Sequence, residues 1–151
     1  MSNKKGLKEI SLLQGLTDKQ LADIEAVGEY RMYQEGEHLF NEGDEGTHVY
    51  CLVSGKVELV VAVGDTSEQV PVHVASDGSV FGEFILFEER PRSATARAVK
   101  SAYVFAITGE SLKAVFAVDP QAGHLVMTNL CSTLVGRMRK TTASLKASLM
   151  W

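Results

Sequence analysis

Cysteine is scarce in this sequence: only Cys51 and Cys131 are present, and each stands alone in an apolar stretch. Such spacing excludes a disulfide framework and a cysteine-rich metal site, and it is typical of proteins from a reducing compartment. We therefore expect a cytoplasmic protein in which both cysteines are small core residues.

Long apolar runs and an excess of positive charge are also missing. The apolar run LVVAV at 59–63 falls far short of the ~20 residues that a membrane span needs. The lysines near the N-terminus are not followed by the apolar stretch of a secretory signal. The net charge is −4, which argues against a general surface for nucleic acid or acidic lipid. We expect neither a nucleic acid nor a membrane as partner, and any anion site must be local.

A catalytic constellation is missing as well. His38, His48, His73 and His124 are scattered along the chain, without a nucleophile and base at a recognisable spacing. A metal enzyme built on a cupin-like barrel is one alternative, with His38, Glu42, His48 and His73 meeting at the ion. The His-x-His motif followed by Glu that such a site requires is absent. We therefore expect a binding protein and no enzyme, without a metal or a cofactor.

The length of 151 residues fits one domain, which buries roughly 68–70% of its unfolded surface. Neither an internal repeat nor a linker divides the chain. We predict a single domain over residues 1–151, made of an N-terminal helical segment at 1–28, a β-barrel at 29–107 and C-terminal helices at 108–151.

Capping signals mark the expected helices. Thr17 is a good N-cap, and Gln20 stands three residues later, where it completes a capping box. Gly28 is expected to end this helix in the left-handed conformation. Asp119 and Pro120 form the N-cap and first turn of a second, longer helix that we expect to reach almost to the C-terminus.

The middle of the chain has the pattern of short strands. Turn signals such as EGE, EGDEG, SGK, GDTS and SDGS recur every 8 to 14 residues or so. Short strands with this punctuation are typical of a small barrel or sandwich. We therefore predict a mainly β fold with flanking helices.

The long C-terminal helix carries a second pattern. A stripe with the alternating spacing of a coiled-coil seam runs along it through Met127, Cys131, Leu134, Met138, Thr141, Leu145 and Ser148. Its polar members make the seam imperfect. Two interpretations stay open: the stripe packs on the barrel, or it joins two copies in a homodimer.

The stretch VFGEFILFEERPRSATARA at 80–98 combines one acid and one arginine with backbone of little bulk. Gly82 permits close approach of a ligand to the backbone, and Arg92 has the planar fork that fits a phosphate. Ser93 and Ala94 are small enough to leave their amides accessible. Glu83 would repel a phosphate but can accept hydrogen bonds from sugar hydroxyls. The pattern predicts a nucleotide site; the alternative is a structural ion pair between Glu83 and Arg92.

This stretch resembles the phosphate-binding cassette of the cyclic nucleotide-binding domain family, which includes the bacterial catabolite activator protein and the regulatory subunits of cyclic AMP-dependent protein kinase. The matching positions are Phe81, Gly82, Glu83, Leu86, Pro91, Arg92, Ser93, Ala94, Thr95 and Ala98. A second block resembles the family's glycine-punctuated strands at Glu42, Gly43, Asp44, Gly46, Tyr50, Gly55 and Val57.

The resemblance implies an eight-stranded jelly-roll β-barrel with flanking helices and a cassette at 81–95. It implies that Glu83 binds the ribose 2′-hydroxyl and that Arg92 binds the cyclic phosphate. On the same basis Thr141 and Thr142 of the long helix contact the purine. The predicted ligand-binding residues are Phe81, Gly82, Glu83, Phe84, Arg92, Ser93, Ala94, Thr141 and Thr142.

Three positions depart from the family pattern: Ile85 replaces a small residue, Thr47 an acid and Ala96 a valine. Ile85 motivates the alternative of an interaction module that binds no nucleotide. Ser93 after the arginine is compatible with cyclic GMP and with cyclic AMP, and we favour cyclic AMP. The expected output is movement of the C-terminal helix, toward an unknown effector protein, a second copy or a region outside this chain.

Overall fold

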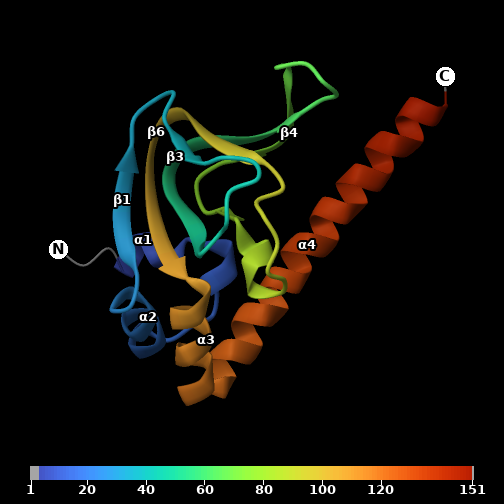
Figure 1. Ribbon diagram of the computed structural model, residues 1–151. Coiled ribbons are helices and arrows are strands. Elements are labelled where there is room, and N and C mark those ends of the chain that lie inside the picture. The colour runs from blue at the N-terminus through green and yellow to red at the C-terminus, as the bar shows by residue number, and fades with distance from the viewer. Residues whose placement is uncertain (1–3, 151) are drawn as a thin grey trace.

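The computed structural model of the protein describes residues 4–150. Its centre is one antiparallel sheet with the strand order β1-β6-β3-β4, in which β2 also pairs with β6 and β5 with β3. The strands curl around an enclosed core (Figure 1). Their bounds are β1 Glu29–Tyr33, β2 His38–Phe40, β3 His48–Ala62, β4 Gln69–Ala75, β5 Val80–Phe81 and β6 Thr95–Thr108. The predicted jelly-roll architecture with flanking helices is confirmed.

Over residues 4–150 the structure has six strands, whereas the family resemblance implies eight. The two longest strands explain the difference. β3 and β6 contain 15 and 14 residues, and their pairing register shifts repeatedly between Leu52 and Val57. Gly55 lies at this point with φ 120°, and a Cβ atom there would lie 2.3 Å from the carbonyl oxygen of Ser101. The strand pair therefore bends at Gly55, and the two halves of β3 and of β6, with the four short strands, correspond to the eight segments.

The helical elements are α1 Lys4–Lys8, η1 Ser11–Leu13, α2 Asp18–Glu25, η2 Glu83–Leu86, α3 Gly109–Val118 and α4 Pro120–Leu149. Helices α1, α2 and α3 lie at one end of the sheet, and α4 starts there and runs along one side (Figure 1). A core cluster of large aliphatic residues, including Leu12, Leu112 and Leu130, joins them to the sheet. A second cluster, including Leu52, Phe81 and Val104, fills the inside of the barrel.

Gly28 does not end α2 in the way its sequence position suggests. The helix stops at Glu25, and its C-cap Ala26 is right-handed, with φ −66°. Gly28 is absent from the glycines with positive φ. A Cβ atom at Gly28 would lie 2.2 Å from Cζ of Phe105. The prediction of a left-handed stop is therefore wrong, and the glycine instead makes room for a buried ring.

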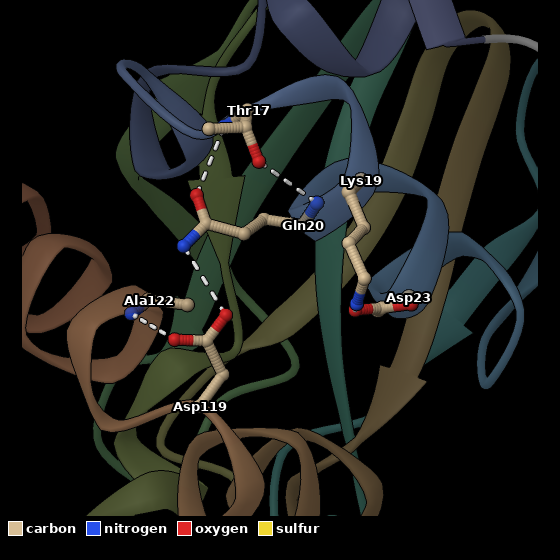
Figure 2. Close-up of polar contacts among 6 residues, drawn as sticks. All are labelled: Thr17, Lys19, Gln20, Asp23, Asp119 and Ala122. Carbon is tan, nitrogen blue, oxygen red and sulfur yellow. Dashed lines mark hydrogen bonds and ion pairs between the residues drawn. The ribbon is translucent and has the colours of Figure 1, made fainter.

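The caps of α2 and α4 are linked to each other. Gln20 Oε1 accepts a hydrogen bond from the Thr17 amide at 2.9 Å, and Thr17 Oγ1 accepts one from the Gln20 amide at 3.1 Å, which confirms the capping box. Gln20 Nε2 also donates to Asp119 Oδ2 at 3.2 Å, while Asp119 Oδ1 accepts from the Ala122 amide at 3.1 Å (Figure 2). One glutamine thus fixes the start of α4 against the start of α2.

Helix α4 has two different halves. Its first half packs on the core through Ala122, Val126 and Leu130. Its second half extends beyond the sheet (Figure 1), and the Met138 side chain there is 70% exposed. None of the described helices, α4 included, combines the length and apolar character that crossing a bilayer requires.

The two cysteines differ in environment. Cys51 is buried in the core as expected, and burial raises the pKa of its thiol to about 12. Cys131 is exposed on α4, so the prediction of a core residue is wrong there. The seam divides in the same way, because Met127 and Leu134 pack against the core while Met138 and the seam residues after it are exposed.

Candidate ligand-binding site

A cavity of about 350 Å³ opens between the cassette, the sheet and α4. Six of the predicted residues line it. The lining residues are Phe40, Leu59, Gly82, Glu83, Phe84, Ile85, Glu88, Arg90, Pro91, Arg92, Ser93, Ala94 and Arg137. Phe81 is not among them: its ring is fully buried and stacks on Tyr50, with 5.4 Å between centroids. Phe81 therefore supports the site from the core.

Gly82 turns the chain from β5 into the short helix η2. Its φ of 75° is in the left-handed region, which an L side chain rarely occupies. A Cβ atom at Gly82 would also lie 2.8 Å from Arg92 Nη1. The glycine is therefore required both by the backbone conformation and by the close approach of the arginine.

Arg92 is buried, with 8% of its surface exposed. Its Nη1 donates to the Gly82 carbonyl at 3.1 Å and its Nη2 to the His48 carbonyl at 2.7 Å. The guanidinium lies over the ring of Phe40 at 4.2 Å, and its Nε has no hydrogen-bond partner among residues 4–150. Burial lowers the pKa of Arg92. A buried cation held only by neutral groups is well suited to bind an anion.

The second sequence block holds Arg92 in place. The Arg92 amide donates to the Asp44 carbonyl at 2.7 Å, and the Gly43 amide donates to the Arg92 carbonyl at 2.9 Å. A Cβ atom at Gly46 would lie 2.6 Å from Arg92 Nε. The glycine-punctuated loop thus fixes the backbone of Arg92 and leaves space for its side chain.

Glu83 is 3% exposed and forms an ion pair with an arginine that sequence analysis missed. Arg137 Nη1 donates to Glu83 Oε1 at 2.6 Å, and Arg137 Nη2 donates to the Val80 carbonyl at 2.5 Å. Within residues 4–150 no ion pair joins Glu83 to Arg92, so the alternative of a structural pair between them is wrong. The available signal was the acid itself, since a buried carboxylate requires a cationic or hydrogen-bonding partner.

Thr141 and Thr142 are not brought to the cavity. Both are exposed on the second half of α4. Thr141 Oγ1 donates to the Arg137 carbonyl at 3.0 Å, and Thr142 lies beside Val135 and Met138 on the exposed part of the helix. Their contact with a purine stays a prediction.

Ile85 lines the cavity without closing it, because two glycines accommodate its side chain. A Cβ atom at Gly46 would lie 2.8 Å from Ile85 Cγ2, and one at Gly109 would lie 3.2 Å from Ile85 Cδ1. Of the other departures, Thr47 Oγ1 is hydrogen-bonded to His48 Nδ1 at 2.8 Å, and Ala96 is fully buried. Ile85 therefore does not block the cavity, and it no longer supports the alternative of an interaction module that binds no nucleotide.

The residues of the cupin-like alternative do not meet. His38 Nδ1 is paired with Asn41 Oδ1 at 2.6 Å, and Glu42 Oε1 accepts from the Ala62 amide at 2.9 Å. Over the part of the chain that the structure describes, no three His, Cys, Asp or Glu side chains gather as metal ligands. The geometry gives that alternative no support.

Comparison with known proteins identifies the family to which the chain is similar. The sequence model of the family described as "Cyclic nucleotide-binding domain" matches residues 30–119. A protein named Cyclic AMP receptor protein from Thermus thermophilus is 30% identical over 139 residues, which cover 92% of this chain and 62% of that protein. This chain spans less than two thirds of the length of the first curated relatives that it matches.

Two solved structures are similar in fold. The crystal structure of Thermus thermophilus catabolite activator protein is 29% identical, with a TM-score of 0.76 over 91% of this chain and 62% of that chain. A cyclic nucleotide-binding domain from Methylobacillus flagellatus has a TM-score of 0.85 at 18% identity, over 96% of this chain and 85% of that one. The second likeness concerns the fold alone.

Proposed function

The chain belongs to the cyclic nucleotide-binding domain family, and from this premise we propose that it is a regulatory module that binds cyclic AMP and signals through α4. The observation that carries the proposal is the buried guanidinium of Arg92 on the cavity wall, without a carboxylate partner within ion-pair distance among residues 4–150. An oxygen of a cyclic phosphate satisfies that cation better than the neutral carbonyls that it contacts now.

Glu83 is the proposed contact for the ribose of the nucleotide. A ribose hydroxyl donates to a carboxylate, and Glu83 is the acid held in the cavity wall beside Arg137. Bound nucleotide therefore touches a residue that is itself bonded to α4. Ligand binding shifts the equilibrium between two positions of α4 only if the ligand binds one state more tightly than the other. The size of the shift is set by that difference in affinity. The Glu83–Arg137 contact supplies such a difference, because the sugar and the helix share one carboxylate.

The second half of α4 is the proposed output surface. Val135, Met138, Leu145 and Leu149 are each at least half exposed there. Such a helix face fits either the same helix of a second copy, as a homodimer, or an effector protein. We propose the homodimer, in a cytoplasmic protein, on the seam pattern and the cysteine usage.

Calorimetric titration of the purified protein with cyclic AMP, cyclic GMP and 5′-AMP tests the proposal. We expect cyclic AMP to bind more tightly than cyclic GMP, and 5′-AMP to bind much more weakly because its phosphate is not cyclised. Absence of heat with both cyclic nucleotides would overturn the proposal in favour of an interaction module without ligand.

A further inference from the structure

His73 is a partly buried residue that the site described above does not use. It lies near the middle of β4, and its Nε2 atom is shielded from solvent without a hydrogen-bond partner among residues 4–150. A buried nitrogen that has lost water and gained no partner is unfavourable, and such groups are rare in native structures. A bound ligand that donates a hydrogen bond to Nε2 would supply the missing partner.

His73 is not among the residues that line the cavity, but it is paired with one of them. In the β3–β4 register His73 is paired with Leu59, which lines the cavity. Directly paired residues place their side chains on the same face of a sheet. Arg137, which also lines the cavity, and Lys140 of α4 act electrostatically on the imidazole. The imidazole therefore lies on the same face of the sheet as Leu59, within electrostatic range of α4.

His73 is held in its neutral form at this place. Burial is the largest influence that lowers its pKa, and the positive charges of Arg137 and Lys140 lower it further. A neutral imidazole has one donor and one acceptor nitrogen. With the proton on Nδ1, Nε2 is the acceptor, and it requires an N–H or O–H donor.

We propose that His73 contacts the base of the bound nucleotide, with Nε2 accepting a hydrogen bond from the exocyclic amino group of adenine. This rests on the proposed function and specifies which base the site selects. Arg92 takes the phosphate and Glu83 the ribose; Arg137 pairs with Glu83 at 2.6 Å, and His73 is paired across the strands with Leu59 of the cavity wall. The base is the remaining part of the ligand and extends toward that wall.

The proposal predicts discrimination between purines. Adenine has an amino donor where guanine has the carbonyl acceptor O6. An acceptor Nε2 fits the first group and faces an unfavourable contact with the second unless the imidazole moves its proton. The site therefore favours adenine through His73.

The test compares cyclic AMP with purine riboside 3′,5′-cyclic monophosphate, which lacks only the 6-amino group, by calorimetric titration of the whole chain. Wild-type protein should bind the analogue more weakly by roughly three- to tenfold, the range of one neutral hydrogen bond. In His73→Leu the two ligands should bind equally, through loss of cyclic AMP affinity alone. His73→Gln should keep part of the preference because its amide oxygen accepts. His124→Leu, an exposed position on α4, is the control and should keep all of it.

The outcomes separate this inference from the function on which it rests. If wild type binds cyclic AMP but does not distinguish the analogue, or if His73→Leu keeps the wild-type ratio, the role of His73 is wrong and the nucleotide site stands. If wild type binds no cyclic nucleotide, both are overturned. Comparison of the two ligands on wild type needs no variant, so a poorly folded His73→Leu protein does not block the test.

Discussion

Glu83 of the cassette and Arg137 of α4 form an ion pair of 2.6 Å, in which the acid side chain is 4% and the arginine side chain 26% exposed. The pair joins a residue of the candidate ligand site to the helix that we propose as the output. Removing one partner leaves the other charge buried and unpaired, whereas removing both does not.

Arg137→Ala should therefore destabilise the protein by about 3 kcal/mol, the lower end for a broken buried pair, because Arg137 is partly exposed. Urea unfolding followed by circular dichroism measures this change. Arg139→Ala, an exposed position on the same helix, should cost little. Adding Glu83→Gln to Arg137→Ala should recover part of the loss. Equal stability of the Arg137 and Arg139 variants would contradict the role of the pair.

Gly82→Ala should lower both stability and ligand affinity. The left-handed φ costs an L residue roughly 1–2 kcal/mol, and the new Cβ atom would lie 2.8 Å from Arg92 Nη1. Gly64→Ala separates the two effects, because Gly64 also has positive φ, whereas a Cβ atom added there would meet no described atom within 4 Å. Thermal melts should shift in both variants, whereas cyclic AMP titration should change only for Gly82→Ala.

Stability should fall as the pH is lowered from about 7.5 to 5.5. The pKa values of His48 and His73 are both lowered, mainly by burial and further by nearby arginines. The unfolded chain therefore binds more protons in this window than the folded protein, so acid favours unfolding, and the contribution is complete above the ordinary histidine pKa of about 6.5. Melting temperatures across the window should change less in a His48→Gln, His73→Gln double variant. An equally steep dependence in that variant would refute this assignment.

Thr17→Ala should destabilise the protein by at least the ~1 kcal/mol that a lost N-cap usually costs. The loss should exceed that of an isolated cap, because Gln20, which bonds Thr17, also holds Asp119 at the start of α4. Thr17→Ser keeps the hydroxyl and should be close to wild type in a thermal melt. A Thr17→Ala protein as stable as Thr17→Ser would show that the capping box is dispensable.

Features that depend on neighbours in sequence could be predicted from the sequence. The capping box needs only Thr17 and Gln20, and the cassette brings Glu83 and Arg92 to one cavity because only the short helix η2 and one loop separate them. Asp119 at the start of α4 is of the same kind. In each case the chemistry and the geometry lie within a few residues of chain.

Features that depend on contacts between residues far apart in the chain could not be predicted from the sequence. Arg137 is 54 residues from Glu83, and nothing in its local sequence marks the side of α4 that faces the cassette. Gly28 has the position of a helix stop, but the ring of Phe105, far along the chain, determines its role. Cys131 is exposed although Met127 and Leu134, its neighbours on the stripe, pack against the core, so its exposure depends on how α4 is rotated against the core.

The central claim is that Arg92 binds the phosphate of a cyclic nucleotide, and its most direct test is calorimetric titration of Arg92→Ala with cyclic AMP beside wild type and Arg139→Ala. Loss of one partner of a buried charged contact costs roughly 2–5 kcal/mol, or about 30-fold to several thousand-fold in affinity. We predict that loss for Arg92→Ala, with an unchanged circular dichroism spectrum and wild-type affinity in the Arg139 variant. Binding of cyclic AMP by a folded Arg92→Ala protein as tight as that of wild type would contradict the claim.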